Sequence, residues 1–144
     1  MLQSLHSSYS VVMEDKLLTL REQLSDLIES KNLVRNKWIT NDKIEIYVIV
    51  GIRLLPIKNI GIPGRYGLER VQCVDVANVI VDPLYQRKGY FKAFLEDAES
   101  LCTELNIDVV YIENVINKFL HKFLMRENYK PITVGELTSY YKVV

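Results

Sequence analysis

Residues 76–101, VANVIVDPLYQRKGYFKAFLEDAESL, join an apolar strand to an amphipathic helix through a short polar turn. Apolar and β-branched residues dominate up to Val81, which predicts a strand buried on both faces. From Gly89 to Leu105 apolar residues recur at helical spacing, which predicts a helix. The first amides of such a helix lack internal partners and lie at its positive end, so the turn is suited to an anion such as a phosphate.

Length and composition are typical of one globular domain. The chain has 144 residues, enough for a core of its own, and we expect a single domain over residues 1–144. Hydrophobic residues make up 49% and charged residues 25% of the chain, as in ordinary soluble proteins. Basic and acidic residues number 18 each, and this balance argues against a nucleic-acid partner.

The cysteines and the apolar runs indicate the cellular compartment of the protein. The N-terminal residues lack a basic segment followed by a long apolar one, and no apolar run is long enough to cross a bilayer. Cys73 and Cys102 are the only cysteines, and their separation predicts buried reduced thiols rather than a disulfide or a zinc site. We therefore expect a cytoplasmic protein without membrane contact or metal.

The remaining pattern predicts a mixed α/β fold with helices packed on a sheet. The expected elements are a short strand at residues 8–13, a helix at 14–30, strands at 34–40 and 43–55, a loop at 56–70, a strand at 71–81, a helix at 89–105, a strand at 108–115, a helix capped by Asn117, and strands at 131–134 and 137–144. The loop has GxxGxxG spacing, but it leads into a strand, so it does not indicate a phosphate-binding loop.

The segment VIVDPLYQRKGYFKAFL, residues 79–95, resembles the acetyl-CoA signature of the GCN5-related N-acetyltransferases, the GNAT superfamily. That signature is a strand ending in Val-x-Pro, then Gln/Arg-x-x-Gly-x-Gly/Ala, then a helix; Phe91 stands where the family has Gly or Ala. Residues 109–132 resemble the next strand and helix of the family, and the likeness covers residues 71–144. It implies a mixed, mainly antiparallel sheet with splayed central strands and helices on both faces.

The resemblance implies acetyl-CoA as the acyl donor. In the family the pantetheine arm lies between the splayed strands and bonds to backbone, which here would belong to Val79, Ile80 and Val81. Asn117 would face the pantetheine or adenosine side, and it equally suits a helix N-cap. The amides of the turn would hold the pyrophosphate; they belong to Gln86, Arg87, Lys88, Gly89, Tyr90 and Phe91.

The implied reaction is direct attack of an amine on the acetyl thioester. A lysine-type amine has a pKa near ~10.4 and is mostly protonated at neutral pH, so a base or a water relay must remove a proton. Asp75 lies in the strand before the turn, where histone-type members carry a catalytic glutamate, and it is the candidate base. The alternative is that Asp75 pairs with a neighbouring cation. Glu113 on the next strand is a second candidate base.

The departing thiolate must receive its proton from a donor other than the tyrosine that the family usually has. The family's tyrosine position holds Leu124, which cannot donate a proton. Water could supply the proton, and His121, one turn earlier on the same helix face, is the candidate side chain. Tyr111 and Tyr129 are further candidates. A histidine among apolar residues is also compatible with a purely packed role.

Two functions remain open at this point. The first is an acetyl-CoA-dependent N-acetyltransferase acting on an amine of a small molecule, a protein or an aminoacyl group; the intact turn favours it. The second is a catalytically inactive GNAT-fold module that binds CoA or acts through protein contacts, which Leu124 and Phe91 favour. No signature identifies the acceptor. The terminal strand and the first helix could support a homodimer.

Overall fold

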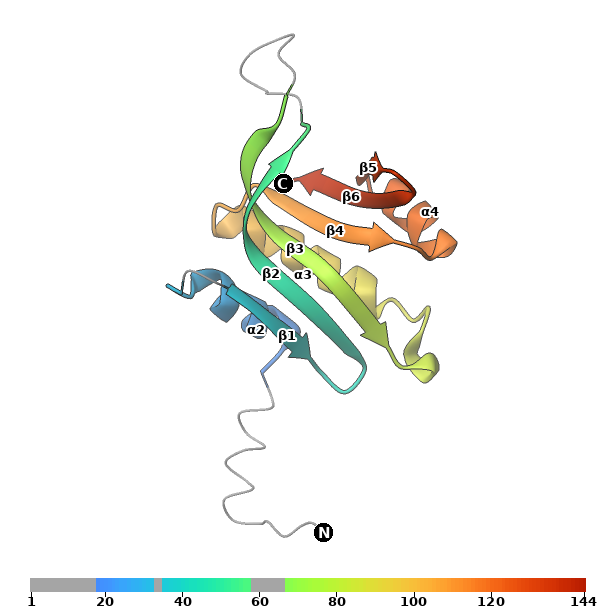
Figure 1. The fold of residues 1–144 in the computed structure, drawn as a ribbon. Helices are drawn as coiled ribbons and strands as arrows, with labels where there is room; N and C mark the ends of the chain where they lie inside the picture. Colours follow the sequence, from blue (N-terminus) through green and yellow to red (C-terminus); the bar gives the residue numbers. More distant parts are fainter. Residues whose placement is uncertain (1–17, 33–34, 58–66) are drawn as a thin grey trace.

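The computed structural model describes residues 18–32, 35–57 and 67–144, and these form a mixed α/β fold (Figure 1). The predicted strand at residues 8–13 lies outside the described residues. The elements are α2 (Leu20–Glu29), β1 (Arg35–Thr40), β2 (Ile44–Leu55), β3 (Glu69–Val81), the 3-10 helix η1 (Pro83–Tyr85), α3 (Tyr90–Glu104), β4 (Val109–Val115), α4 (Lys118–Arg126), β5 (Lys130–Val134) and β6 (Leu137–Val143).

Within the described residues α2 starts later than the apolar pattern predicts. We expected helix from Glu14, but Leu18 and Thr19 are not helical and the helix begins at Leu20. Thr19 forms a capping box with Glu22: its hydroxyl accepts from the Glu22 amide at 3.1 Å, and Glu22 Oε1 accepts from the Thr19 amide at 2.9 Å. Such a box fixes the first turn, so the helix cannot extend past it.

The described strands form one sheet of six, in the order β1-β2-β3-β4-β6-β5. Neighbouring strands are antiparallel except β3 and β4, whose parallel pairing is permitted by the crossover helix α3. The β2–β3 ladder reaches Leu55 opposite Glu69, so β3 starts inside the segment predicted as loop up to Arg70. The sheet is mainly antiparallel, as predicted.

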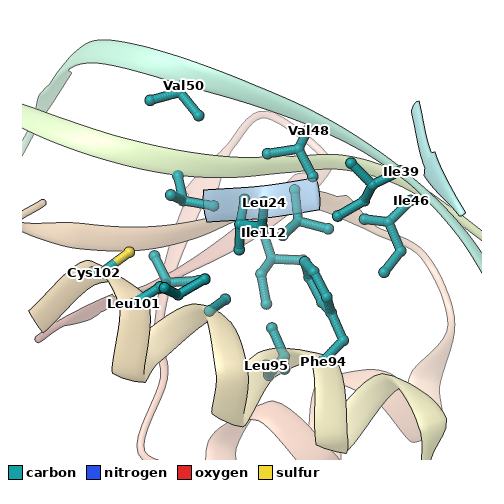
Figure 2. Close-up of a cluster of buried hydrophobic side chains, with 14 of the residues drawn as sticks. Leu24, Ile39, Ile46, Val48, Val50, Phe94, Leu95, Leu101, Cys102 and Ile112 are labelled. Carbon is teal, nitrogen blue, oxygen red and sulfur yellow. The ribbon is translucent and has the colours of Figure 1, made fainter. Parts of the chain in front are cut away.

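The main core lies on one face of the sheet (Figure 2). Leu24 of α2, Phe94 of α3 and Leu124 of α4 are all fully buried in it, so all three described helices contribute to this cluster. We had expected helices on both faces, but the described helices α2, α3 and α4 all pack into the cluster on this one face. The opposite face, called here the outer face, carries a smaller cluster built on strand side chains, namely Leu55, Cys73, Val109 and Tyr111.

Candidate functional site

The parallel strands β3 and β4 separate part-way along their length (Figure 1). Their ladder begins at Cys73 opposite Val109 and ends at Val76 opposite Ile112, although β3 continues to Val81 and β4 to Val115. Beyond Val76, β3 pairs only with β2 among the described strands. Its backbone groups on the β4 side therefore have no ladder partner there, and the predicted splay of the central strands is confirmed.

A β-bulge lies in each of the two strands close to this opening. In the β2–β3 ladder Tyr47 faces Asn78 and Val48 faces Val76, so Ala77 is an extra residue. In the β4–β6 ladder the register shifts between Ile112 and Val115, around Asn114, whose φ of 46° is left-handed. Bulges bend and twist the strand that carries them, so they give a physical reason for the separation of β3 from β4.

The turn after β3 is held by local hydrogen bonds. Asp82 caps η1 by accepting from the Leu84 amide at 2.9 Å. Gln86 Nε2 donates to the Val81 carbonyl at 3.1 Å, which ties the turn to the end of the strand. The Gln86 side chain thus already has a structural role in addition to its predicted place at the cofactor.

The N-terminus of α3 carries free donor groups. Gly89 is its N-cap residue, with a left-handed φ of 84°, and no side chain of the described residues caps it. The first helical hydrogen bond runs from the Ala93 amide to the Gly89 carbonyl. The amides of Tyr90, Phe91 and Lys92 therefore lack intrahelical acceptors. Because a Cβ at Gly89 would meet nothing within 4 Å among the described residues, backbone conformation rather than space favours glycine here.

Positive charge lies around the turn from two segments of the chain. Arg87 and Lys88 are exposed within it. The Arg87 guanidinium lies 4.3 Å from the centre of the Phe119 ring, so it reaches from the turn to the first residues of α4. Lys43, from the β1–β2 connection, places its ammonium 5.7 Å from the Tyr90 ring centre. Sequence reasoning missed Lys43 because only the sheet register brings that hairpin to the turn.

Phe91, which departs from the family pattern, points into the main core. Its side chain is half-buried, packs against the core cluster and stacks on Phe94 with ring centres 6.3 Å apart. Tyr90 is also half-buried and meets the Tyr85 ring edge-on at 5.8 Å. A bulky side chain at residue 91 is therefore accommodated by the core.

Asn117 is the N-cap of α4, as predicted. Its Oδ1 accepts from the amides of Phe119 at 2.8 Å and Leu120 at 3.2 Å. Its role toward a cofactor stays a prediction. Asn128, expected in a left-handed conformation after the helix, has a φ of 69°.

Asp75 lies on the outer face, one residue before the last β3–β4 pair. It is only 4% exposed, and its Oδ2 accepts from Arg53 Nε at 2.9 Å and from Arg53 Nη2 at 2.6 Å. The same Arg53 contacts Glu113 and lies 4.1 Å over the Tyr111 ring centre. Asp75 Oδ1 is buried and has no hydrogen-bond partner in the described part of the chain. The structure thus joins both candidate bases through a cation that sequence reasoning missed.

Burial has the largest effect on the pKa of Asp75. Desolvation raises the pKa of Asp75 to about 7, against the opposing effect of the Arg53 guanidinium, and the nearby Glu113 carboxylate adds to the rise. A carboxyl with this pKa is partly ionised at neutral pH, where it can both accept and release a proton.

His121 is hydrogen-bonded rather than simply packed. Its Nδ1 lies 2.7 Å from the hydroxyl of Tyr140, a buried residue of β6. Tyr140 stands opposite Ile112, the last residue of β4 that pairs with β3. Sequence reasoning missed Tyr140, since the β4–β6 register alone places it there. Leu124, at the family's tyrosine position, is fully buried.

The other two tyrosine candidates have partners elsewhere. Tyr111 is buried under Arg53 on the outer face. Tyr129 donates to Glu99 of α3 at 2.8 Å, and burial raises the pKa of its hydroxyl well above the ordinary value. Tyr129 is thus part of the contact between α3 and the segment after α4.

Solved structures resemble this fold. AtaT complexed with acetyl-methionyl-tRNAfMet matches with a TM-score of 0.54 and 13% identity, over 77% of this chain and 71% of that chain. A putative acetyltransferase from Agrobacterium tumefaciens matches with a TM-score of 0.52 and 14% identity, over 100% and 97% of the two chains. AtaTR bound with acetyl-CoA matches with a TM-score of 0.51 and 9% identity, over 77% and 70%.

These likenesses show that the chain has the fold of the GNAT acetyltransferases. No protein-family model matches the sequence, and no curated protein matches it. In the described ranges no helix is long and apolar enough to span a membrane.

Proposed function

We propose that the protein is an acetyl-CoA-dependent N-acetyltransferase that moves an acetyl group to an amine by direct attack on the thioester. The observation that carries this proposal is the opening between β3 and β4, which ends at the free amides of the α3 N-terminus. Val79, Ile80 and Val81 would offer their backbone groups to pantetheine. Amides of residues 86–91 would bind the pyrophosphate, supported by the helix dipole.

Asp75 would act as the base for the incoming amine. It is the residue before the last β3–β4 pair, so it lies at the closed end of the opening. Its pKa of about 7 suits proton removal at neutral pH. Arg53 holds the carboxylate in place through Oδ2, and Oδ1 is buried without a hydrogen-bond partner in the described part of the chain. Glu113, bound to the same guanidinium, is the alternative base.

His121 would protonate the departing thiolate. Leu124 cannot do so, and the hydrogen bond to Tyr140 fixes the orientation of the His121 ring. Because this bond involves Nδ1, Nε2 is the nitrogen left for a proton transfer.

One solved structure and the net charge of the chain bear on the class of acceptor. One solved structure with this fold is AtaT complexed with acetyl-methionyl-tRNAfMet, so an aminoacyl amine is one acceptor to test for this chain. The chain itself has a formal net charge of zero, which favours a small-molecule or protein amine over a polyanion.

Calorimetric titration of acetyl-CoA tests the turn. We expect binding to the wild type and a loss of at least about tenfold in affinity, about 1.4 kcal/mol, for Gly89→Asp, whose carboxylate would repel the pyrophosphate. Gly135→Asp is the matched control, because Gly135 also has a left-handed φ, 62°, but lies in the β5–β6 turn. This control should bind like the wild type.

The alternative function is an inactive GNAT-fold module. Two observations favour it: Leu124 replaces the usual proton donor, and Asp75 is engaged by Arg53. A wild type that binds acetyl-CoA but releases no CoA thiol with any amine of a broad panel would support the module. A wild type that does not bind acetyl-CoA would contradict the enzyme proposal altogether.

A further inference from the structure

Arg87 has a backbone conformation that arginine rarely adopts. Its φ is 59°, in the left-handed region. The other non-glycine residues with positive φ in the described part of the chain are Asn106, Asn114 and Asn128, and asparagine tolerates this region better than most residues. Arginine at this position therefore costs conformational free energy, and strained residues of this kind are concentrated at functional sites. A contribution of the Arg87 side chain must offset the cost.

The Arg87 side chain meets a second cation at the mouth of the β3–β4 opening. Arg87 belongs to the turn that follows β3, and Phe119 belongs to the first turn of α4, which follows β4. The Arg87 guanidinium lies 4.3 Å and the Lys118 ammonium 5.8 Å from the centre of the Phe119 ring. Two positive charges from different segments therefore lie close to one aromatic ring, and Phe119 is 54% exposed.

Neither cation is neutralised by an acid that the structure describes. Arg87 and Lys118 are exposed, and they form no ion pair with any described residue. The segments 83–95 and 114–126 contain no acidic residue at all. Two like charges near one ring repel each other, and an exposed cation–π contact is weak. An anion bound beside the ring would therefore stabilise this arrangement.

The place of the ring in the fold indicates which anion this is. In the proposed function the α3 amides hold the pyrophosphate and the pantetheine arm lies inside the opening, so the adenosine lies at its mouth. The ribose of acetyl-CoA carries a further phosphate on its 3′ oxygen, close to the adenine. The Phe119 and Leu120 amides already donate to Asn117 Oδ1, so α4 offers side chains to this group. A guanidinium suits a phosphate, and an exposed aromatic ring suits a base.

We propose that Arg87 and Lys118 bind the 3′-phosphate of acetyl-CoA and that its adenine stacks on Phe119. Arg87 donates N–H groups to the phosphate oxygens, and Lys118 adds a point charge. This recognition makes the protein selective for CoA thioesters over analogues that lack the 3′-phosphate. The inference rests on the proposed binding of acetyl-CoA, but it assigns these residues no role in the acetyl transfer itself.

Calorimetric titration with acetyl-CoA and with its 3′-dephospho form tests this assignment. At low ionic strength we expect the wild type to bind acetyl-CoA about tenfold more tightly, and added salt should reduce the difference by screening the exposed charges. Arg87→Asn should weaken acetyl-CoA binding about tenfold and change the affinity for the dephospho form by less than about twofold. Because asparagine tolerates the left-handed conformation, this variant should melt no lower than the wild type.

Two further variants separate the phosphate from the base. Lys118→Gln should reduce the difference between the two ligands, because it removes one of the two cations. Phe119→Leu should weaken both ligands equally, because both carry the adenine. Lys122→Gln is the matched control: Lys122 is another exposed cation of α4, one turn further along the helix, and its loss should leave the difference unchanged.

The outcomes distinguish this inference from the proposed function. Equal affinity of the wild type for the two ligands would overturn the inference and leave the proposed function intact. An equal loss for both ligands in Arg87→Asn would also overturn it, because that result would assign Arg87 to the pyrophosphate. Binding of neither ligand to the wild type would contradict the proposed function, and this inference with it.

Discussion

The buried carboxyl of Asp75 has one oxygen paired with Arg53 and one without a partner among the described residues. Its burial determines how its protonation affects the fold. Burial raises its pKa to about 7, above the 3.8 of an unperturbed aspartate. Between these two values the folded chain holds a proton that the unfolded chain has released. The free energy of unfolding must therefore fall as the pH rises through this window, and it levels off above about pH 7.

The replacement Asp75→Asn removes this titration. We expect the wild type to lose on the order of 1–4 kcal/mol of unfolding free energy, relative to the variant, between about pH 4 and about pH 8. Urea denaturation of both proteins across this range measures the difference. Arg53→Met should extend the falling region to higher pH, because the guanidinium lowers the Asp75 pKa. Parallel curves for wild type and Asp75→Asn would show that Asp75 titrates at its ordinary value.

The same pKa predicts the pH dependence of activity. If Asp75 is the base, only its ionised form removes the proton, so kcat/KM should rise with pH through about 7. Steady-state rates of CoA release with an amine that the protein acetylates, measured from acid to neutral pH, give this profile. A profile flat across neutral pH, in a protein that acetylates the amine, would assign the base role to Glu113 or to water.

Single residues show what sequence reasoning can and cannot reach. Asp75 was proposed from its place in the strand before the turn and Gly89 from the local pattern, and their functional roles stay predictions. Arg53 was not found, because its contact with Asp75 depends on the register of β2 against β3. Nothing in the order of residues along the chain specifies that register.

At the scale of elements, the N-caps of α2 and α4 allow an effect on stability to be distinguished from an effect on cofactor binding. Asn117 caps α4 beside the proposed cofactor site, and Thr19 caps α2 in contact with β1. Either replacement by alanine should lower the free energy of unfolding by about 1 kcal/mol. We expect only Asn117→Ala to weaken acetyl-CoA binding as well, as calorimetry of both variants would show. Equal affinities in the two variants would leave Asn117 as a plain N-cap.

Elements were predicted well where a periodic pattern exists. The apolar stripe of α3 and the β-branched run of β3 identified both elements to within two residues. The start of α2 was predicted too early because its leucines continue the pattern past the Thr19–Glu22 box, a signal that the sequence does contain. The bulge at Ala77 has no such signal, since an alanine among valines looks like ordinary strand. The feature that opens the site was therefore predictable only through family resemblance.

At the scale of the whole molecule, the two cysteines lie on opposite faces of the sheet. Cys102 belongs to the main core and Cys73 to the outer cluster, and they are 0% and 1% exposed. Burial raises the pKa of each thiol to about 12, so neither reacts readily in the folded state. Labelling of either thiol then requires an opening of the structure.

We propose that both faces belong to one cooperatively folded domain, and single-cysteine variants test this. Cys73→Ala leaves only Cys102, and Cys102→Ala leaves only Cys73. If both thiols become accessible only by global unfolding, their labelling rates, corrected for the stability of each variant from urea denaturation, should agree within about threefold. Much faster labelling of Cys73 would show that the outer face, with Asp75, opens independently of the helical core.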